Sequence, residues 1–489
     1  MQDTSLLFGV IPPSLCTPEQ VATWDDGKVL HTYKLLRTPV NWGEIIQYGN
    51  AAMAIWRDNG TLTYIAPCNG DTHFPESNES KPSLWFYLNH LKLDITGNTE
   101  KDVAETAAFF LQLEEPTGQT SILDITGHTP DDFDFRAVDV QCLAHIFEVA
   151  PLRCVRFCCL TLSAEQSRVL ATRPHAVELA FCGCLFDDHG DAFVDALLSR
   201  QSLFGSLEIE DNDLLSDNNL KRLLQADVLN YLGLQSLKNE LLFLPLPARV
   251  DSLDYRMSSK SLMEDDFQHA FIAAKKLSLV IDHDGQQFPT EALISFLQRV
   301  AALGHFVSLR FLVIMPNRFI AIPVCIAHEL IHATLANPNL EVLDLSFCNW
   351  DWEPHFEILF EGIKDHKQLC SLHLCARKPA TSFGSDFCHL RKLLSVNRKI
   401  IVWDERENPF SDGSSIDALY ELNRFYRGSA GLVAESPAER QLLLASALME
   451  NAADNLQCSA LLLFDHLDVL FDLLQFAHLN ELFGDNLRL

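Results

Sequence analysis

The hydrophobic positions in the middle of the chain follow a repeating frame, seen most clearly at residues 340–348. This stretch reads LEVLDLSFC, with apolar anchors at Leu340, Leu343 and Leu345 and a small polar side chain at Cys348. Residues two apart in an extended chain point to the same side. The stretch therefore predicts a short strand with a buried face, followed by a turn that the last residue closes.

The same frame recurs along the chain. A gap of 45 residues separates the middle anchors Leu232 and Leu277, which predicts an insertion or a degenerate copy there. Weaker copies pair Leu123 with Ile125, Val177 with Leu179, and Ile400 with Val402, and the closing polar position is filled by Cys182, Asn212, Asn317 and Cys348. The full copies have their three anchors at Leu152, Val155, Phe157; Phe204, Leu207, Ile209; Leu229, Leu232, Leu234; Ala274, Leu277, Leu279; Leu309, Leu312, Ile314; and Leu369, Leu372, Leu374.

Between the strands the pattern becomes helical. Residues 323–339 and 354–368 precede the strands at Leu343 and Leu372, which lie 29 residues apart, so position n of the first helix is expected beside n + 29 of the second. This rule pairs residues that are mostly apolar on both sides: Ala327 with Phe356, Leu330 with Leu359, Ile331 with Phe360, and Thr334 with Ile363.

A strand, turn and helix unit of nearly 30 residues resembles the ribonuclease-inhibitor type of leucine-rich repeat. The resemblance covers about residues 120–403 and implies an α/β solenoid with a curved parallel sheet inside and helices outside. It also implies that a partner protein binds the concave strand face. It implies no particular ligand.

The two ends of the chain lack the frame. Residues 51–67 predict a β-hairpin turning at Asn59-Gly60, and residues 1–118 form a small β-rich or mixed region. After residue 403, amphipathic runs at 416–427, 439–451 and 461–482 predict a helical cap over the open repeat end. The alternative for the last run is an amphipathic helix that binds a partner. The predicted domains are 1–118, the solenoid 119–403, and the cap 404–489.

Composition and charge limit the classes of partner and the compartment that are expected for this chain. The net charge of −29 repels nucleic acid and anionic lipid. The apolar run at 459–479 is interrupted by Asp465, Asp468 and Asp472, so no segment is expected to cross a membrane. The 14 cysteines show no C-x-x-C pair and are expected to be free thiols in a reducing compartment, the cytoplasm or alternatively the nucleus.

One short motif favours catalysis. His328, Glu329 and His332 form H-E-x-x-H, which on a helix can hold zinc and supply a general base, with Glu353, Glu357 or Glu361 as a third ligand. A helical wheel, however, puts both histidines opposite the stripe of Ile326, Leu330 and Thr334. The stacking rule then explains them as surface pairs, His328 with Glu357 and His332 with Glu361. We expect no enzyme activity, metal or other cofactor.

The strand residues that point away from the core form the expected binding surface. Phe347, Trp350 and Trp352 are expected at its rim as aromatic anchors. Most of its charged or imidazole side chains are acidic, which favours a basic protein or peptide as partner. These side chains belong to Asp124, Arg156, Glu178, Glu208, Glu210, Asp344 and His373.

Three function classes follow from the sequence. The first is a non-catalytic protein-binding scaffold, the second is a zinc peptidase built on residues 328–332, and the third is an adaptor with effector activity in its N-terminal region.

Overall fold

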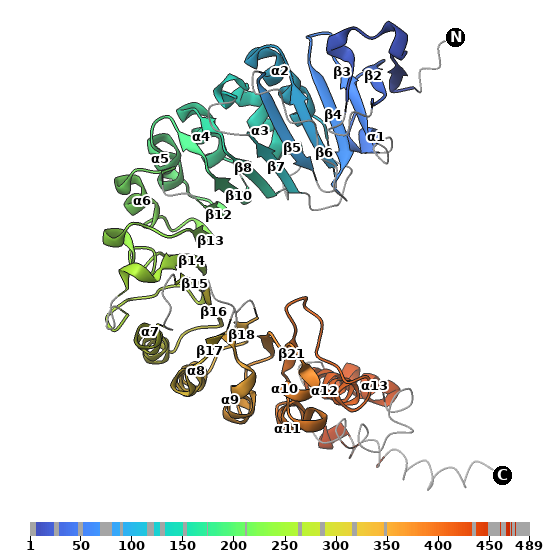
Figure 1. Ribbon diagram of the computed structural model, residues 1–489. Helices are drawn as coiled ribbons and strands as arrows, with labels where there is room; N and C mark the ends of the chain where they lie inside the picture. The colour runs from blue at the N-terminus through green and yellow to red at the C-terminus, as the bar shows by residue number, and fades with distance from the viewer. Residues whose placement is uncertain are drawn as a thin grey trace, which may run out of the picture. The chain divides into compact units, whose positions relative to one another are not determined.

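The computed structural model describes most of the chain (Figure 1). The described residues are 6–23, 29–46, 52–68, 81–88, 91–114, 122–127, 133–149, 154–173, 175–210, 213–262, 267–283, 289–314, 320–346, 350–432, 437–447, 460, 466–469, 471 and 475. They form two compact units, Met1–Met257 with Phe271–Ala274 (unit 1) and Ser258–Ala270 with Lys275–Leu489 (unit 2). Both are mixed α/β structures in which most strand pairs are parallel.

Unit 1 begins with a mainly antiparallel sheet. The hairpin predicted at Asn59-Gly60 is confirmed, because β3 (Met53–Trp56) and β4 (Leu62–Pro67) pair antiparallel around Gly60, whose φ is +85°. The strands lie in the order β1-β2-β3-β4-β6-β5-β7. The other elements are β1 (Phe8–Val10), β2 (Thr32–Leu35), α1 (Trp42–Ile46), β5 (Ser83–Leu88), β6 (Leu91–Thr96), α2 (Glu100–Leu111), β7 (Ile122–Thr126), η1 (Pro13–Leu15) and η2 (Pro18–Gln20).

The N-terminal strands continue into the repeating part of unit 1 through β5, which pairs antiparallel with β7. From β7 onward all pairs are parallel, in the order β7-β8-β10-β12-β13-β14. The strand β5 therefore covers the edge of β7, which would otherwise present unpaired backbone groups.

The repeating part of unit 1 alternates strands with helices that gather on one side of the strands (Figure 1). A second short parallel pair, β9 with β11, runs beside the main sheet. These elements are β8 (Cys154–Cys158), β9 (Thr161–Leu162), β10 (Val177–Cys182), β11 (Leu185–Phe186), β12 (Gly205–Ile209), β13 (Leu229–Leu234), β14 (Ser252–Ser258), η3 (Phe135–Ala137), α3 (Val140–Val149), α4 (Ala164–Ala171), α5 (Asp191–Ser199), α6 (Asp217–Leu223) and η4 (Asn239–Leu241).

The core of this part of unit 1 is a chain of aromatic rings between strands and helices. Phe157 stacks on Phe181 with ring centroids 5.7 Å apart, and Phe181 meets Phe193 edge-on at 5.9 Å. All three side chains are less than 2% exposed. Burying each of them contributes about 1.5–3 kcal/mol of hydrophobic free energy, so the anchors of successive repeats stabilise one another.

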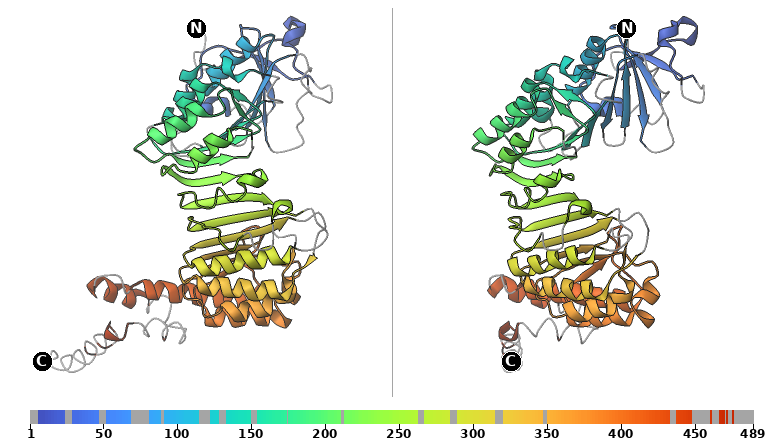
Figure 2. Two further views of the ribbon diagram at one scale, coloured as in Figure 1. Left: turned by 90° about the vertical axis from the view of Figure 1, so that its left-hand side faces the viewer. Right: turned by 60° about the vertical axis from the view of Figure 1, so that its left-hand side comes forward.

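Unit 2 repeats the plan with strands in the order β15-β16-β18-β20-β21, all parallel. Figure 2 shows α7, α8, α9 and α11 lying side by side. The elements are η5 (Ser259–Ser261), β15 (Lys276–Asp282), α7 (Thr290–Leu303), β16 (Ser308–Ile314), β17 (Ile320–Ala321), α8 (Val324–Ala336), β18 (Val342–Leu345), β19 (Trp350–Asp351), η6 (Glu353–His355), α9 (Phe356–Ile363), β20 (Ser371–Leu374), α10 (Pro379–Ser382), η7 (Ser385–Phe387), α11 (Cys388–Val396), β21 (Ile401–Trp403), α12 (Ser415–Gly431) and α13 (Pro437–Ala447).

Buried polar side chains join the ends of the helices in unit 2. The Asn337 amide donates to the carbonyl oxygens of Ala333 at 2.8 Å and Val300 at 3.2 Å, and its oxygen accepts from the backbone N–H of Phe306 at 2.9 Å. Asn397 donates to the carbonyl of His366 at 3.0 Å. These bonds supply donors to carbonyls in the last turns of the helices, and the Val300 carbonyl accepts from the backbone N–H of Gly304 as well.

The 29-residue spacing of the repeats at Leu343 and Leu372 is confirmed, since these two residues face each other across β18 and β20. The helices predicted before them are confirmed as α8 and α9. The 45-residue gap holds a further parallel strand, since β14 places Leu253 beside Leu232. Its buried Val250, Leu253 and Tyr255 fit the three anchor positions.

Three predicted copies of the frame were out of register. The structure aligns Leu179, not Val177, with Val155 and Leu207. It aligns Leu309, not Leu312, with Leu277 and Leu343, and Val402, not Ile400, with Leu372. Each of these segments carries extra apolar residues next to the anchors, so more than one register satisfied the pattern, and the strand pairing selects one.

The register of β10 moves the closing position from Cys182 to Cys184. Cys184 is fully buried, and its Sγ donates to the carbonyl oxygen of Phe157 at 3.2 Å, which is the bond expected of this position. Cys182 lies on the other side of the strand and is half-buried. The predicted closing residues Asn212, Asn317 and Cys348 lie outside the described residues.

The predicted domain boundaries at 118/119 and 403/404 fall inside unit 1 and unit 2 respectively, and they stay predictions. In the C-terminal region, the helices predicted at 416–427 and 439–451 correspond to α12 and α13. Most of the third predicted run, 461–482, lies outside the described residues.

Candidate functional site

Residues 328–332, which carry the H-E-x-x-H motif, lie in the middle of α8 with the orientation that the helical wheel predicted. Ile326 and Leu330 are fully buried against the repeat core, whereas His328 and His332 are exposed. His332 lies 3.6 Å from Glu329 of its own helix. The two histidines therefore belong to the outer surface of unit 2.

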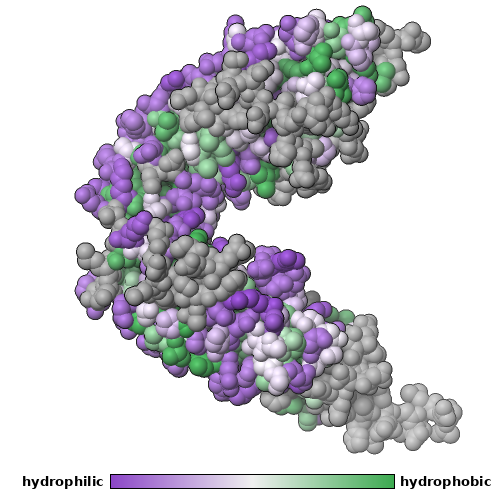
Figure 3. Space-filling model, viewed as in Figure 1, coloured by the Kyte–Doolittle hydropathy of each residue, from purple (hydrophilic) through white to green (hydrophobic). Residues whose placement is uncertain are grey.

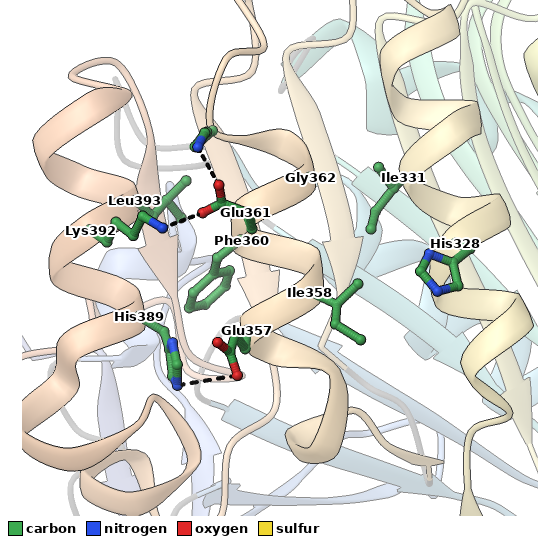
Figure 4. A pocket seen from close by; sticks show the side chains of 11 residues that line it. His328, Ile331, Glu357, Ile358, Phe360, Glu361, Gly362, His389, Lys392 and Leu393 are labelled. Carbon is green, nitrogen blue, oxygen red and sulfur yellow. Dashed lines mark hydrogen bonds and ion pairs between the residues drawn. The ribbon is translucent and has the colours of Figure 1, made fainter.

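The ion pairs predicted between α8 and α9 are wrong. Glu357 lies 4.0 Å from His389 of α11, and Glu361 pairs with Lys364 and, at 2.7 Å, with Lys392 of α11. Figure 4 shows both carboxylates turned away from His328 and toward α11. Hydrogen bonds from the two lysines lower the pKa of Glu361 to about 2, so it is an anion at neutral pH.

A groove of about 470 Å³ lies between α8, α9 and α11, lined by His328, Ile331, Glu357, Ile358, Phe360, Glu361, Gly362, Lys364, His389, Lys392 and Leu393 (Figure 4). It mixes apolar side chains with paired charges. Among the residues that the structure describes, no three His, Cys, Asp or Glu side chains gather closely enough to hold a metal ion.

The strand face of unit 1 carries an aligned row of side chains. Strand pairing places Lys92, Tyr87, Asp124 and Arg156 next to one another in that order. The row continues through Ala180, Glu208, Gly233 and Asp254. Alternation along each strand puts this row opposite the buried anchors. Residues from 92 to 254 thus form one continuous line on the side of the strands that lacks α3 to α6.

Arg156 is the cation at the centre of this row. Burial lowers its pKa, but Asp124, Glu210 and Glu208 outweigh burial and raise it. Burial has the opposite effect on the carboxyl groups and raises the pKa of Asp124 and of Glu208. The positive charge of Arg156 lowers both pKa values and so opposes this rise. The guanidinium therefore compensates several half-buried carboxylates at once, so the row is less acidic than its carboxylate count implies.

Unit 2 has a corresponding row of Ser278, Arg310, Asp344, His373 and Trp403. Arg310 lies 3.4 Å from Asp344, which also accepts hydrogen bonds from the hydroxyl and backbone N–H of Ser346. The His373 ring stacks on Trp403 with centroids 6.1 Å apart. Within this row, Arg310 thus lies beside Asp344 and His373 stacks on Trp403, whereas the buried Ser278 hydroxyl has no hydrogen-bond partner.

The structure brings most of the predicted surface residues to the strand faces. In unit 1, Asp124, Arg156, Glu208 and Glu210 are half-buried and Glu178 is exposed at the start of β10, and in unit 2 Asp344 and His373 are half-buried. Whether they bind a partner stays a prediction. Figure 3 shows hydrophilic residues also predominating over α4 to α6, so polarity alone does not single out the strand face.

The prediction of an exposed aromatic anchor is wrong for Trp352. Its side chain is 1% exposed, because it turns inward at the start of η6 and packs in the core. Trp350 belongs to the short strand β19, and Phe347 lies outside the described residues.

The sequence frame missed several residues of these rows. Arg310 was missed because the predicted anchors of its strand were three residues out of register. Asp254 was missed because the frame was not recognised in its strand, β14. Lys92 and Asp94 escaped because their strand pairs antiparallel and lies outside the frame. A period-two pattern of buried and polar residues in 91–96 was the available signal.

The described cysteines are free thiols. In and next to β8 and β10, Cys184 is fully buried, whereas Cys154, Cys158, Cys159 and Cys182 are partly exposed. Burial raises the pKa of Cys184 to about 12, so this thiol stays protonated at neutral pH.

No protein-family model matches this chain, and no curated protein matches it either. Within the described residues, no helix is both long enough and apolar enough to span a bilayer.

Proposed function

We propose that this chain is a non-catalytic, protein-binding scaffold built as a leucine-rich-repeat solenoid of the ribonuclease-inhibitor-like type. The partner is a protein with basic groups, bound on the strand faces. The observation that best supports this proposal is the aligned row from Lys92 to Asp254 in unit 1, which places polar and charged side chains on one sheet face over a long distance.

The charge pattern supports a partner with a defined distribution of charge. Lys92 and Arg156 both lie in the row of unit 1 that also holds acidic residues, so a uniformly basic peptide meets two repulsive positions there. Charges that are arranged in a fixed pattern contribute to the choice of partner and to the association rate more than to affinity itself.

The experiment is affinity capture from a native lysate with a charge-reversed variant. Lysine replaces Glu178, Glu208 and Asp344 on the strand faces. The matched control reverses Glu105, Glu165 and Glu421, which are exposed on helices. We expect the first variant to lose proteins that the unaltered chain and the control both retain. An unchanged set of captured proteins would remove the basis for the proposal.

The two alternative classes need separate tests. Stoichiometric zinc in the purified protein, together with loss of peptide cleavage in His328→Ala, would favour the peptidase. A truncation at residue 120 does not test N-terminal effector activity cleanly, because it removes β5 from its pairing with β7 and exposes that edge. Point variants in the N-terminal region test this activity without exposing that edge.

A further inference from the structure

Asp94 is a carboxylate in the middle of a strand in unit 1. Its neighbours on β6, Leu93 and Ile95, are fully buried in the core. Asp94 points to the opposite side, where strand pairing sets it between Tyr64 of β4 and Trp85 of β5. Although this is the strand face, the Asp94 side chain is only 1% exposed.

The Asp94 carboxylate is not fully partnered. Its Oδ1 atom is buried and accepts no hydrogen bond. Burial raises the pKa of Asp94 to about 7, against the positive charge of Lys92 and a weak hydrogen bond from the Trp85 indole N–H, which leaves part of the accepting capacity of the carboxylate open. A buried carboxylate oxygen without a donor costs free energy, so a group that supplies donors there would be bound favourably.

A pocket of about 240 Å³ opens beside this carboxylate, between the strands and the segment that follows η2. Glu19 contributes a second carboxylate at the exposed side. A hydrogen bond from Thr17 lowers the pKa of Glu19. The lining residues are Pro18, Glu19, Val21, Thr23, Trp56, Gly60, Leu62, Tyr64, Lys81, Asp94, Thr96, Gly97 and Asn98.

Lys92, two residues from Asp94 on β6, acts on the Asp94 carboxylate by its charge but does not line the pocket. Lys92 Nζ lies over the Trp85 ring, 4.4 Å from its centroid, and 5.5 Å from that of Tyr87. Lys81 lines the pocket and acts on Glu19. The pocket therefore offers two carboxylates and the aromatic side chains of Trp56 and Tyr64, with Lys81 as its one basic lining residue among those described.

We propose that this pocket binds a cationic nitrogen group, either an ammonium or a guanidinium, with Asp94 accepting its hydrogen bonds. Trp56 and Tyr64 flank the group, since aromatic faces attract cations. Glu19 adds a second negative charge at the entrance. The volume is smaller than the roughly 300 Å³ at which pockets for drug-sized ligands begin. It therefore suits one lysine or arginine side chain, or a small free amine.

The site does not depend on the proposed function, because it lies among the N-terminal antiparallel strands and is not made from the repeating part. Its test uses the full chain and four probes measured by calorimetry. Two are the cationic N-acetyl-lysine methylamide and N-acetyl-arginine methylamide. The third is butylammonium, which represents a free amine. The fourth, N-acetyl-norleucine methylamide, has a similar shape to the lysine probe without the charge.

We expect the cationic probes to bind at least about tenfold more tightly than the norleucine probe, which corresponds to one decade in Kd. Tighter binding of the amino-acid derivatives than of butylammonium identifies a polypeptide side chain as the source. Equal binding identifies a free amine. Equal binding of the norleucine probe, or no binding of any probe at millimolar concentration, overturns the proposal.

Two variants locate the site. Asp94→Asn keeps the shape and removes the charge, and is expected to weaken the cationic probes about tenfold or more. Glu19→Gln lies on the surface, does not threaten folding, and is expected to weaken them less. Glu165→Gln, on the exposed surface of α4, removes the same charge elsewhere in unit 1 and should change nothing. Unaltered binding in both pocket variants contradicts the assignment.

The pH dependence supplies an independent readout. Groups around Asp94 are Lys92 on its own strand, Trp85 on β5, Tyr64 on β4, and Glu19 and Lys81 across the pocket. Protonation of Asp94 competes with the cation, so affinity should fall as pH drops below about 7. Asp94→Asn should abolish that fall, and a fall that persists in the variant would place the titrating group elsewhere.

Discussion

The His366 ring connects two successive repeats through its hydrogen bond to Asn337. Its Nδ1 accepts from the backbone N–H of Leu369 at 2.9 Å, which leaves Nε2 to donate to the carbonyl oxygen of Asn337 at 3.0 Å. Asn337 and His366 are both nearly fully buried and lie 29 residues apart, one repeat length. The Asn337 carbonyl at the end of α8 is thus satisfied by a side chain from the neighbouring repeat.

Asn337→Ala is expected to destabilise unit 2 by about 2–4 kcal/mol. The change leaves the buried Phe306 N–H and the carbonyls of Val300 and Ala333 without this partner, and each buried unsatisfied group costs about 1–3 kcal/mol. Denaturant unfolding measures the loss. Asn339→Ala is the matched control, because Asn339 is exposed two residues later. Equal effects of the two changes would contradict the structural role of Asn337.

Gly362→Ala is expected to destabilise the packing of α8 on α9. A Cβ there would lie 2.6–2.9 Å from side-chain atoms of Ile331, and such overpacking costs about 1–3 kcal/mol. Gly428→Ala is the control. Gly428 lies in α12, has open space around it, and should gain up to about 1 kcal/mol from helix propensity. Helix propensity offsets up to about 1 kcal/mol of the cost at Gly362 as well, because Gly362 lies within α9. The thermal midpoint of Gly362→Ala should therefore fall below that of Gly428→Ala, and equal midpoints for the two variants would contradict the close contact.

Cys184→Ala tests the corrected register of β10. It removes the buried Sγ that donates to the Phe157 carbonyl, so we expect a loss of about 1–2 kcal/mol. Cys182→Ala, two residues earlier and half-buried on the other face, should change stability by about 0.5 kcal/mol or less. If Cys182→Ala lowered stability more than Cys184→Ala, the register with Val177 at the middle anchor would be favoured.

Asp94→Asn is expected to stabilise the chain above about pH 7 and to leave it little changed near pH 4. The folded state raises this pKa from 3.8 to about 7, so the folded chain holds a proton that the unfolded chain releases across that range. The free energy of unfolding of the unaltered chain therefore falls as pH rises from about 4 to about 7. Above about pH 7 the full cost of burying the ionised Asp94 carboxylate is present. The upper bound on this cost is on the order of 4 kcal/mol.

The measurement is the difference in denaturation midpoint between Asp94→Asn and the unaltered chain, taken at a series of pH values. The difference should grow steadily from acid to neutral pH and then level off. A difference that stays constant, or that shrinks with rising pH, would show that Asp94 is not a buried carboxylate with a raised pKa.

The strand faces could be predicted only as far as the register was correct. Asp344 and His373 were placed correctly, because the frame around Leu343 and Leu372 has a single solution. Arg310 was missed, since Leu309, Leu312 and Ile314 fit the frame as well as Phe306, Leu309 and Phe311 do. A local pattern cannot separate these registers when neighbouring residues are all apolar. Pairing with Leu277 and Leu343 does so.

The ion pairs on the helices show the same limit. The sequence spacing brings Glu357 beside His328 in repeat register, but the carboxylate turns to His389 of the next helix. Long side chains on a helix surface reach either neighbour, and their rotamers depend on three-dimensional packing that a one-dimensional register does not contain.

The sequence by itself determined the alternation of strand and helix, the inward face of each helix, and the 29-residue step from Leu343 to Leu372, because burial of apolar side chains imposes these periods locally. Tertiary structure decided what depends on distant neighbours. It paired β5 with β7, moved the closing position to Cys184, buried Trp352, and enclosed Asp94 in a pocket made by η2, β4 and β6. Each of these depends on groups far apart in the chain whose meeting no local pattern encodes.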